Sequence, residues 1–180
     1  MRALYQLIFK LAGWKVNGSI PTSLKQYVMI VAPHTSNWDF MVGLAARSIL
    51  RIDTKYVAKK ELFRFPFGWF FKKLGGFPVD RSKNNNFVDA VADLFTEHPV
   101  FSICITPEGT RSYAEKWKSG FYYIAQKAKI PIVMVAFDYG NKQVKVEPAF
   151  MPSGDYEKDL KMMLDYYRKV KGKFPEKGIR

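Results

Sequence analysis

One of the chain's two histidines, His34, directly follows an apolar run and lies five residues before a carboxylate, Asp39. A histidine held by a carboxylate is suited to act as a general base that removes a proton from a reacting hydroxyl. Within one helix, residues five apart lie roughly 140° apart around the axis, so these two side chains would not face each other. We therefore expect His34 in a loop, followed by a helix whose first turn carries Asp39 back toward the imidazole.

The same segment also fits an ordinary helix start. Ser36 and Asp39 have the spacing of a capping box, in which the acid returns a hydrogen bond to the backbone amide of the capping residue. Both interpretations begin the helix near Ser36, and the local sequence leaves both open.

A second polar segment, residues 106–112, follows the β-rich run 100–105. Pro107 and Gly109 favour a tight turn, and the segment also carries a glutamate and an arginine. Such a loop can grip a phosphate, or it can hold only a surface pair of charges.

A third segment, residues 75–82, ends its short apolar run at Asp80 and Arg81. The planar guanidinium of Arg81 suits bidentate contact with a phosphate. An exposed pair between Arg81 and its neighbour Asp80 is the alternative.

Taken in order, these segments resemble the glycerolipid acyltransferase family, which contains the bacterial 1-acylglycerol-3-phosphate acyltransferases. His34 and Asp39 match its H-x4-D block, so the resemblance implies a general base and an aspartate that orients it. Residues 77–81 resemble a second block, which implies phosphate binding by Arg81. The third block matches residues 107–111 and implies that the glycerol phosphate is held by four residues: Glu108, Gly109, Thr110 and Arg111.

Residues 130–135 look like the family's fourth block, which lines the donor or acyl region, with Pro131 at the matching position. The sequence departs from the family pattern at Pro33, where asparagine is common, and at Met134, where a second proline is common. These departures leave the catalytic pair intact and bear on the identity of the acceptor.

The implied reaction is coherent with the residues present. His34 would accept the proton of an acceptor hydroxyl as its oxygen attacks an acyl thioester, with acyl-CoA or acyl carrier protein as co-substrate. The only cysteine, Cys104, lies within an apolar strand pattern and is expected to be buried rather than acylated. His98 is expected at a helix end. One cysteine and two distant histidines predict no metal site, no disulfide and no cofactor, and fit a reducing cytoplasm.

The charge of the chain points to acidic partners. Lys and Arg number 29 against 16 Asp and Glu, a formal net charge of +13. An anionic membrane surface, an acidic acyl carrier or coenzyme A, and nucleic acid would all fit this charge. The absence of a nucleic-acid-binding motif argues against the last. A noncatalytic basic module that binds lipid or nucleic acid is the rival function from another class.

Two segments are candidates for membrane contact. Residues 1–16 form an expected amphipathic helix that is too short to span a bilayer, and residues 62–73 are the densest aromatic stretch, with basic residues at both ends. The side chains expected at the membrane are Leu4, Leu7, Ile8, Leu11, Trp14, Phe67, Trp69 and Phe70. Amphipathic aromatic and basic side chains favour the headgroup boundary, although packing on the protein core would also fit both segments.

The remaining pattern predicts the scaffold. Strand-like runs at 27–32, 54–58, 100–105, 131–136 and 144–148 alternate with helical patterns at 86–98, 120–129 and 156–171. We expect residues 1–180 to form one domain, an α/β sandwich with a largely parallel central sheet flanked by helices and preceded by an amphipathic helix. The lysine-rich segment 169–173 is expected to be a solvated tail.

The resulting hypothesis is a peripheral enzyme on the cytoplasmic face of the membrane. It would transfer a fatty acyl group to a lysophospholipid, above all 1-acylglycerol-3-phosphate, to give phosphatidic acid. O-acylation of another single-chain lipid, such as an aminolipid, is the alternative acceptor chemistry.

Overall fold

In the computed structural model, which describes residues 2–79 and 87–180, seven strands form one central sheet in the order β1-β7-β6-β2-β5-β3-β4. Neighbouring strands are parallel except for β6 and β7. The strands are β1 (Lys15–Asn17), β2 (Gln26–Ala32), β3 (Lys55–Lys59), β4 (Gly76–Val79), β5 (Phe101–Ile105), β6 (Ile132–Asp138) and β7 (Gln143–Val146). The expected α/β class with a largely parallel sheet is confirmed.

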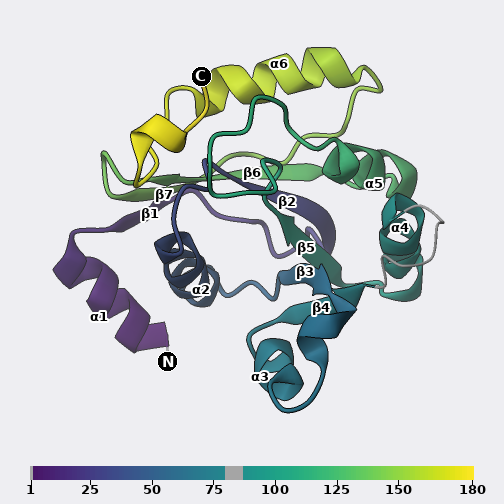
Figure 1. The fold of residues 1–180 in the computed structure, drawn as a ribbon, viewed down its shortest axis with the longest axis horizontal. Helices are drawn as coiled ribbons and strands as arrows, with labels where there is room; N and C mark the ends of the chain where they lie inside the picture. Colours follow the sequence, from purple (N-terminus) through teal and green to yellow (C-terminus); the bar gives the residue numbers. More distant parts are fainter. Residues whose placement is uncertain (1, 80–86) are drawn as a thin grey trace.

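Helices cover both faces of the sheet (Figure 1). They are α1 (Arg2–Ala12), α2 (Trp38–Leu50), α3 (Gly68–Lys73), α4 (Phe87–Glu97), α5 (Gly120–Ala128) and α6 (Tyr156–Tyr167), with short 3-10 turns η1 (Lys60–Phe63) and η2 (Pro175–Lys177). One apolar core packs α4, α5 and α6 against the sheet, and the other packs α1 and α2 against its opposite face. None of the helices among the described residues is long and apolar enough to cross a bilayer.

The central strands have the composition that this burial requires. Every residue of β6 is buried, as are six of the seven in β2, because helices cover both faces of these strands. Continuous apolar runs are typical of parallel strands in this position. All five predicted strands are present, with ends shifted by one or two residues.

Several parts of the chain differ from the sequence-based expectation. The N-terminal helix α1 ends at Ala12 rather than at residue 16, because Gly13 is in the left-handed conformation and residues 15–17 pair with β7 as β1. The short edge strands β1 and β4 were not among the five predicted, and α6 ends at Tyr167 rather than at residue 171. The C-terminal segment 169–180 is not a solvated tail. Val170 is buried, and the backbone N–H of Phe174 donates a hydrogen bond to Thr35 in the loop after β2 (3.2 Å).

Candidate active site

Three adjacent parallel strands bring the site together at one edge of the sheet. β2 lies between β5 and β6, so the loops that follow these three strands meet. They carry His34, the segment around Glu108, and Tyr139, respectively. Open α/β sheets commonly bind ligands at this carboxyl edge, where the strand order departs from the chain order.

His34 lies in the loop before α2, and Asp39 is the second residue of that helix. Nδ1 of His34 lies 3.0 Å from Oδ2 of Asp39. A carboxylate only accepts hydrogen bonds, so the imidazole carries its proton on Nδ1 and keeps a free lone pair on Nε2. The pair therefore has the tautomer that a general base needs.

Asp39 is buried and held by several donors. The backbone N–H groups of Thr35 and Ser36 donate to Oδ2 (2.9 Å each), and the hydroxyl of Tyr139 donates to Oδ1 (2.7 Å). Burial opposes ionisation, but the hydrogen bonds from His34, Tyr139 and Ser36 outweigh it and hold the pKa of Asp39 below its ordinary value. Asp39 thus contacts His34 and also accepts from the Ser36 amide, one half of a capping box, but the helix itself begins after Asn37, whose side chain makes no capping hydrogen bond.

Glu108 contacts the loop that carries His34 directly. Its Oε2 accepts a hydrogen bond from the backbone N–H of His34 (2.7 Å), and its side chain is buried. Burial raises the pKa of Glu108 from 4.5 to about 7, against the lowering effect of that hydrogen bond. In the structure Glu108 thus fixes the position of His34, while contact with a glycerol phosphate stays a prediction.

The other three residues of this loop are exposed. Gly109 adopts a left-handed conformation (φ +66°), as the expected tight turn requires. The Thr110 hydroxyl accepts a hydrogen bond from the N–H of Ser112 (3.2 Å). Arg111 lines the same cavity as His34, so a polar group bound there lies within reach of its side chain.

An apolar cavity of about 240 Å³ begins at the His34–Asp39 pair and runs between α2 and the sheet. Its α2 wall extends from Phe40 to Leu50, a rise of about 15 Å. Gly43 lies in the middle of that wall, where the missing side chain leaves space against Phe137. The shape and lining suit a hydrocarbon chain whose reactive end lies at His34.

The remaining polar candidates do not provide a nucleophile or a metal site. Cys104 lies in the cavity wall, and burial raises its pKa to about 12, so the reactive thiolate is scarcely populated at neutral pH. His98 follows α4, as expected, and its ring packs against Phe77 and Phe101. The described residues contain no cluster of side chains able to hold a metal ion.

The predicted donor-region residue, Pro131, lies away from the cavity. Pro131 lies just before β6, at the amino end of the sheet, whereas β6 contributes Val135 and Phe137 to the cavity. Since strands rise about 3.3 Å per residue, Pro131 lies on the order of 20 Å from His34 along the sheet. Arg81 lies outside the described residues.

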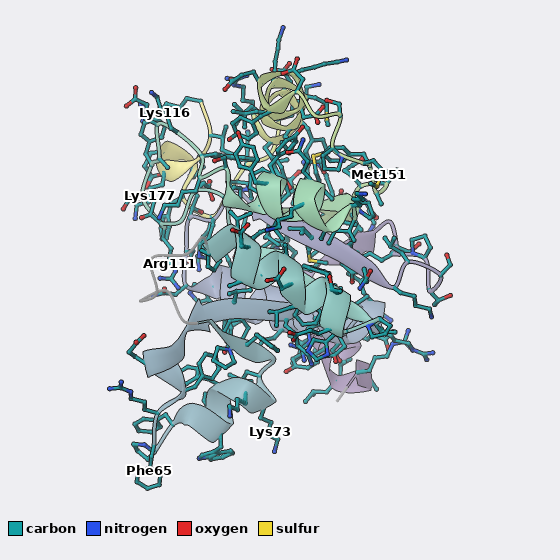
Figure 2. The ribbon with its side chains drawn as sticks, turned by 90° about the vertical axis from the view of Figure 1, so that its right-hand side faces the viewer. Phe65, Lys73, Arg111, Lys116, Met151 and Lys177 are labelled. Atoms are coloured by element: carbon teal, nitrogen blue, oxygen red, sulfur yellow. The ribbon has the colours of Figure 1, made fainter. Side chains whose placement is uncertain are left out.

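The predicted membrane-contact residues are largely exposed. On α1, Leu11 is 79% exposed and three further apolar side chains, Leu4, Leu7 and Ile8, are about half exposed, whereas Trp14 packs on Tyr139. Around α3 the exposed aromatic residues are Phe65, Phe67, Trp69 and Phe70. α1 and α3 project on the same side of the sheet (Figure 1), and Phe65 marks the far tip of the α3 region (Figure 2).

Sequence reasoning missed Tyr139 and the α2 wall of the cavity. Tyr139 follows β6 just as His34 follows β2, so an unexplained polar side chain at a strand's carboxyl end was the available signal. The first turns of α2 also expose Trp38 and Met41, beside the cavity residue Phe40. Large exposed apolar residues just after His34 were a second signal, which pointed to an apolar ligand beside this helix.

Comparison with known proteins agrees with these features. The chain is 33% identical over 160 residues to the 1-acyl-sn-glycerol-3-phosphate acyltransferase of Saccharomyces cerevisiae, which covers 83% of this chain and 50% of the relative. The enzyme of the same name from Streptococcus pneumoniae is 30% identical over 134 residues, 69% of this chain and 49% of the relative. The chain thus spans about half the length of these relatives.

The fold is similar to a solved structure, that of PlsC, the 1-acyl-sn-glycerophosphate acyltransferase of Thermotoga maritima. The TM-score is 0.60 at 18% identity, over 92% of this chain and 74% of the other. A model of the family described as Acyltransferase matches residues 14–138, which include the His34–Asp39 pair and the loop after β5. The chain therefore belongs to the Acyltransferase family.

Proposed function

We propose that this protein transfers a fatty acyl group from an acyl thioester to the free hydroxyl of 1-acylglycerol-3-phosphate, giving phosphatidic acid. The observation that carries the proposal is the His34–Asp39 pair at the end of an apolar cavity that Arg111 also lines. The named relatives, which are 1-acyl-sn-glycerol-3-phosphate acyltransferases, support the choice of acceptor.

In this reaction Nε2 of His34 takes the proton of the acceptor hydroxyl while that oxygen attacks the thioester carbonyl carbon. Asp39 stabilises the imidazolium that forms. The tetrahedral intermediate then collapses, the carbon–sulfur bond breaks, and the leaving thiolate takes the proton from Nε2. The products are an ester and a free thiol, and the enzyme returns to its starting state without a covalent intermediate.

The substrates are placed by chemical complementarity. The apolar cavity between α2 and the sheet takes the acyl chain, because burying its methylene groups is favourable. Arg111 pairs with the phosphate of the acceptor, and Arg81, matched through the family resemblance, has the same proposed role. The donor is an acyl-CoA or an acyl carrier protein, both of which are acidic and would be attracted to the net charge of +13.

We further propose that the exposed apolar residues of α1 and the aromatic residues around α3 bind an anionic membrane surface from its cytoplasmic side. Both groups lie on the α2 side of the sheet, the side on which the acyl cavity lies. A membrane bound there would present single-chain lipids close to the cavity. Lys72 and Lys73 in the last turn of α3 add charge that anionic headgroups attract.

The reaction is tested by transfer of a labelled acyl group from acyl-CoA and from acyl carrier protein to 1-acylglycerol-3-phosphate. His34→Ala should lower the rate by about two orders of magnitude or more, as expected for loss of a general base. His98→Ala is the matched control, since it removes the other histidine and should retain most of the activity.

An aminolipid acceptor assayed in parallel separates the acceptors. Transfer to the aminolipid alone would keep the mechanism and overturn the phosphate-bearing acceptor. No transfer by folded wild-type protein to either acceptor, together with strongly salt-dependent vesicle binding, would favour the noncatalytic basic module.

Membrane binding is tested by sedimentation with vesicles that contain anionic phospholipid. Leu11→Glu should lower the partition coefficient by about tenfold, because an exposed leucine that enters the interface is replaced by a charge that anionic lipid repels. Val100→Glu, at an exposed apolar position before β5, is the control and should change binding less. Equal losses in the two variants would contradict docking through α1.

A further inference from the structure

We propose that Tyr139 is a positioning residue of the catalytic pair: its hydroxyl fixes the plane of the Asp39 carboxylate and thereby the orientation of His34. The inference rests on the proposed acyl transfer for its kinetic consequence. Its structural basis is independent of the substrate. Tyr139 lies just beyond the family match to residues 14–138 and outside the four sequence blocks of the resemblance.

The two oxygens of Asp39 are held in different ways. Oδ2 accepts three hydrogen bonds, all from the loop before α2: from His34 Nδ1 and from the backbone N–H groups of Thr35 and Ser36. Oδ1 accepts a hydrogen bond from the hydroxyl of Tyr139, 100 positions away in the sequence. Without that donor, the carboxylate could turn about Oδ2, and its lone pairs would no longer be fixed toward the imidazole.

Tyr139 is itself held by three segments. It follows β6, its backbone N–H donates to the carbonyl of Lys171 (2.8 Å), and its ring meets the edge of Trp14 at a centroid distance of 4.9 Å and an interplanar angle of 89°. Its position is therefore set by the sheet, the C-terminal segment and the residue that leads from α1 into β1. Such support from several elements is what precise orientation of a catalytic group requires.

The phenol keeps its proton at physiological pH and so remains a donor to Asp39. Burial, together with the hydrogen bond to Asp39 and the charge of that carboxylate, raises the pKa of Tyr139 well above its ordinary value. Among the described residues, the other ionisable groups near the pair are Glu108, from the loop after β5, and the cavity-lining residues Arg111, Arg47, Tyr56 and Cys104. None of these is hydrogen-bonded to Oδ1 of Asp39, so none replaces the phenol.

The variant Tyr139→Phe tests the proposal, because it removes one oxygen and leaves the ring that packs on Trp14. We expect kcat to fall about tenfold or more, the loss that follows from removing a hydrogen bond to a charged group, with little change in KM for either substrate. We also expect the acidic limb of the kcat profile to move to lower pH, because a carboxylate that is no longer fixed toward the imidazole stabilises its protonated form less.

Tyr122→Phe is the matched control. Its hydroxyl donates to Asp159 (2.9 Å), so it too is a tyrosine bonded to a carboxylate, but it is fully buried on α5, away from the catalytic loop. It should leave the pH profile of kcat in place even if it lowers the stability of the fold. An unchanged kcat and pH profile in Tyr139→Phe, or an equal fall in both variants with no movement of the limb, would overturn the proposal.

A measurement without substrate separates this inference from the proposed function. The ring-nitrogen NMR signals of His34, recorded in a His98→Ala background, report the tautomer directly. In the wild type we expect the Nδ1–H form, and in Tyr139→Phe a mixture of tautomers. A wild type that shows these signals but transfers no acyl group would refute the proposed reaction and leave the role of Tyr139 supported. Identical spectra for the wild type and Tyr139→Phe would refute that role.

Discussion

The substitution Glu108→Gln should change how the stability of the protein depends on pH. Glu108 is buried and its Oε2 accepts the backbone N–H of His34. The amide oxygen of glutamine can accept the same hydrogen bond, so the substitution removes the ionisation and keeps the contact. The comparison therefore isolates the free energy of placing a charge at this position.

The size of the effect follows from the pKa of Glu108, which burial raises from 4.5 to about 7. This displacement corresponds to about 3 kcal/mol. Between these two pH values the folded protein holds the proton more tightly than the unfolded chain does, so the wild-type free energy of unfolding falls as the pH rises. Glutamine removes this dependence, and the variant should gain about 3 kcal/mol on the wild type between about pH 4 and about pH 8.

Urea unfolding of both proteins at each pH measures this gain. A constant offset from replacing a carboxyl by an amide cancels, because only the change of the difference with pH is used. Glu115→Gln, at an exposed position in the same loop, should differ from the wild type by no more than about 0.5 kcal/mol at either pH. A Glu108→Gln difference that stays the same at both pH values would refute the buried, proton-binding carboxyl.

Three further substitutions test other parts of the site. Asp39→Asn should lower kcat by about 10³-fold or more, because the amide can hold the wrong imidazole tautomer. Acyl transfer by the folded variant measures the loss, and a loss below tenfold would contradict the proposed role of Asp39. Gly43→Leu should fill the cavity and raise KM for long acyl thioesters more than for short ones, and equal changes would argue against the cavity as the acyl site. Gly172→Ala places a Cβ 2.7 Å from Thr35 Oγ1 and should lower the free energy of unfolding by about 1–3 kcal/mol, whereas Gly120→Ala, whose nearest neighbour is at 4.0 Å, should not.

The parts of the fold that could be predicted are those whose burial is uniform. β2 and β6 are covered on both faces, so their sequences are continuous apolar runs that only a buried element explains. The edge strand β1 has three residues and pairs only with β7, and β4 contains a proline and pairs with β3. Such short strands depend on their neighbours rather than on their own pattern, so periodicity does not show them.

The contact between His34 and Asp39 was predictable because its partners are local, five residues apart across a helix start. The hydroxyl of Tyr139 reaches Asp39 because β6 lies beside β2, and no local sequence pattern indicates that strand order. The C-terminal segment was mispredicted for a similar reason. Its lysines favour water, but the missing side chain of Gly172 lets the backbone approach Thr35 and Pro33, which composition does not reveal.

The surroundings of the two buried carboxyl groups of the site favour opposite protonation states: the charged form of Asp39 and the neutral form of Glu108. Asp39 accepts four hydrogen bonds, which favour its charged form, whereas Glu108 accepts one, and burial dominates there. In the proposed reaction His34 must give its proton to the leaving thiolate, so the charge beside the imidazolium matters. One firmly ionised carboxylate stabilises the imidazolium, and a second carboxyl that retains its proton near neutrality fixes the backbone without adding a full charge. The pH at which Glu108 ionises should therefore influence the basic limb of the acyl transfer profile, and Glu108→Gln should remove that influence if the two groups act on the same proton.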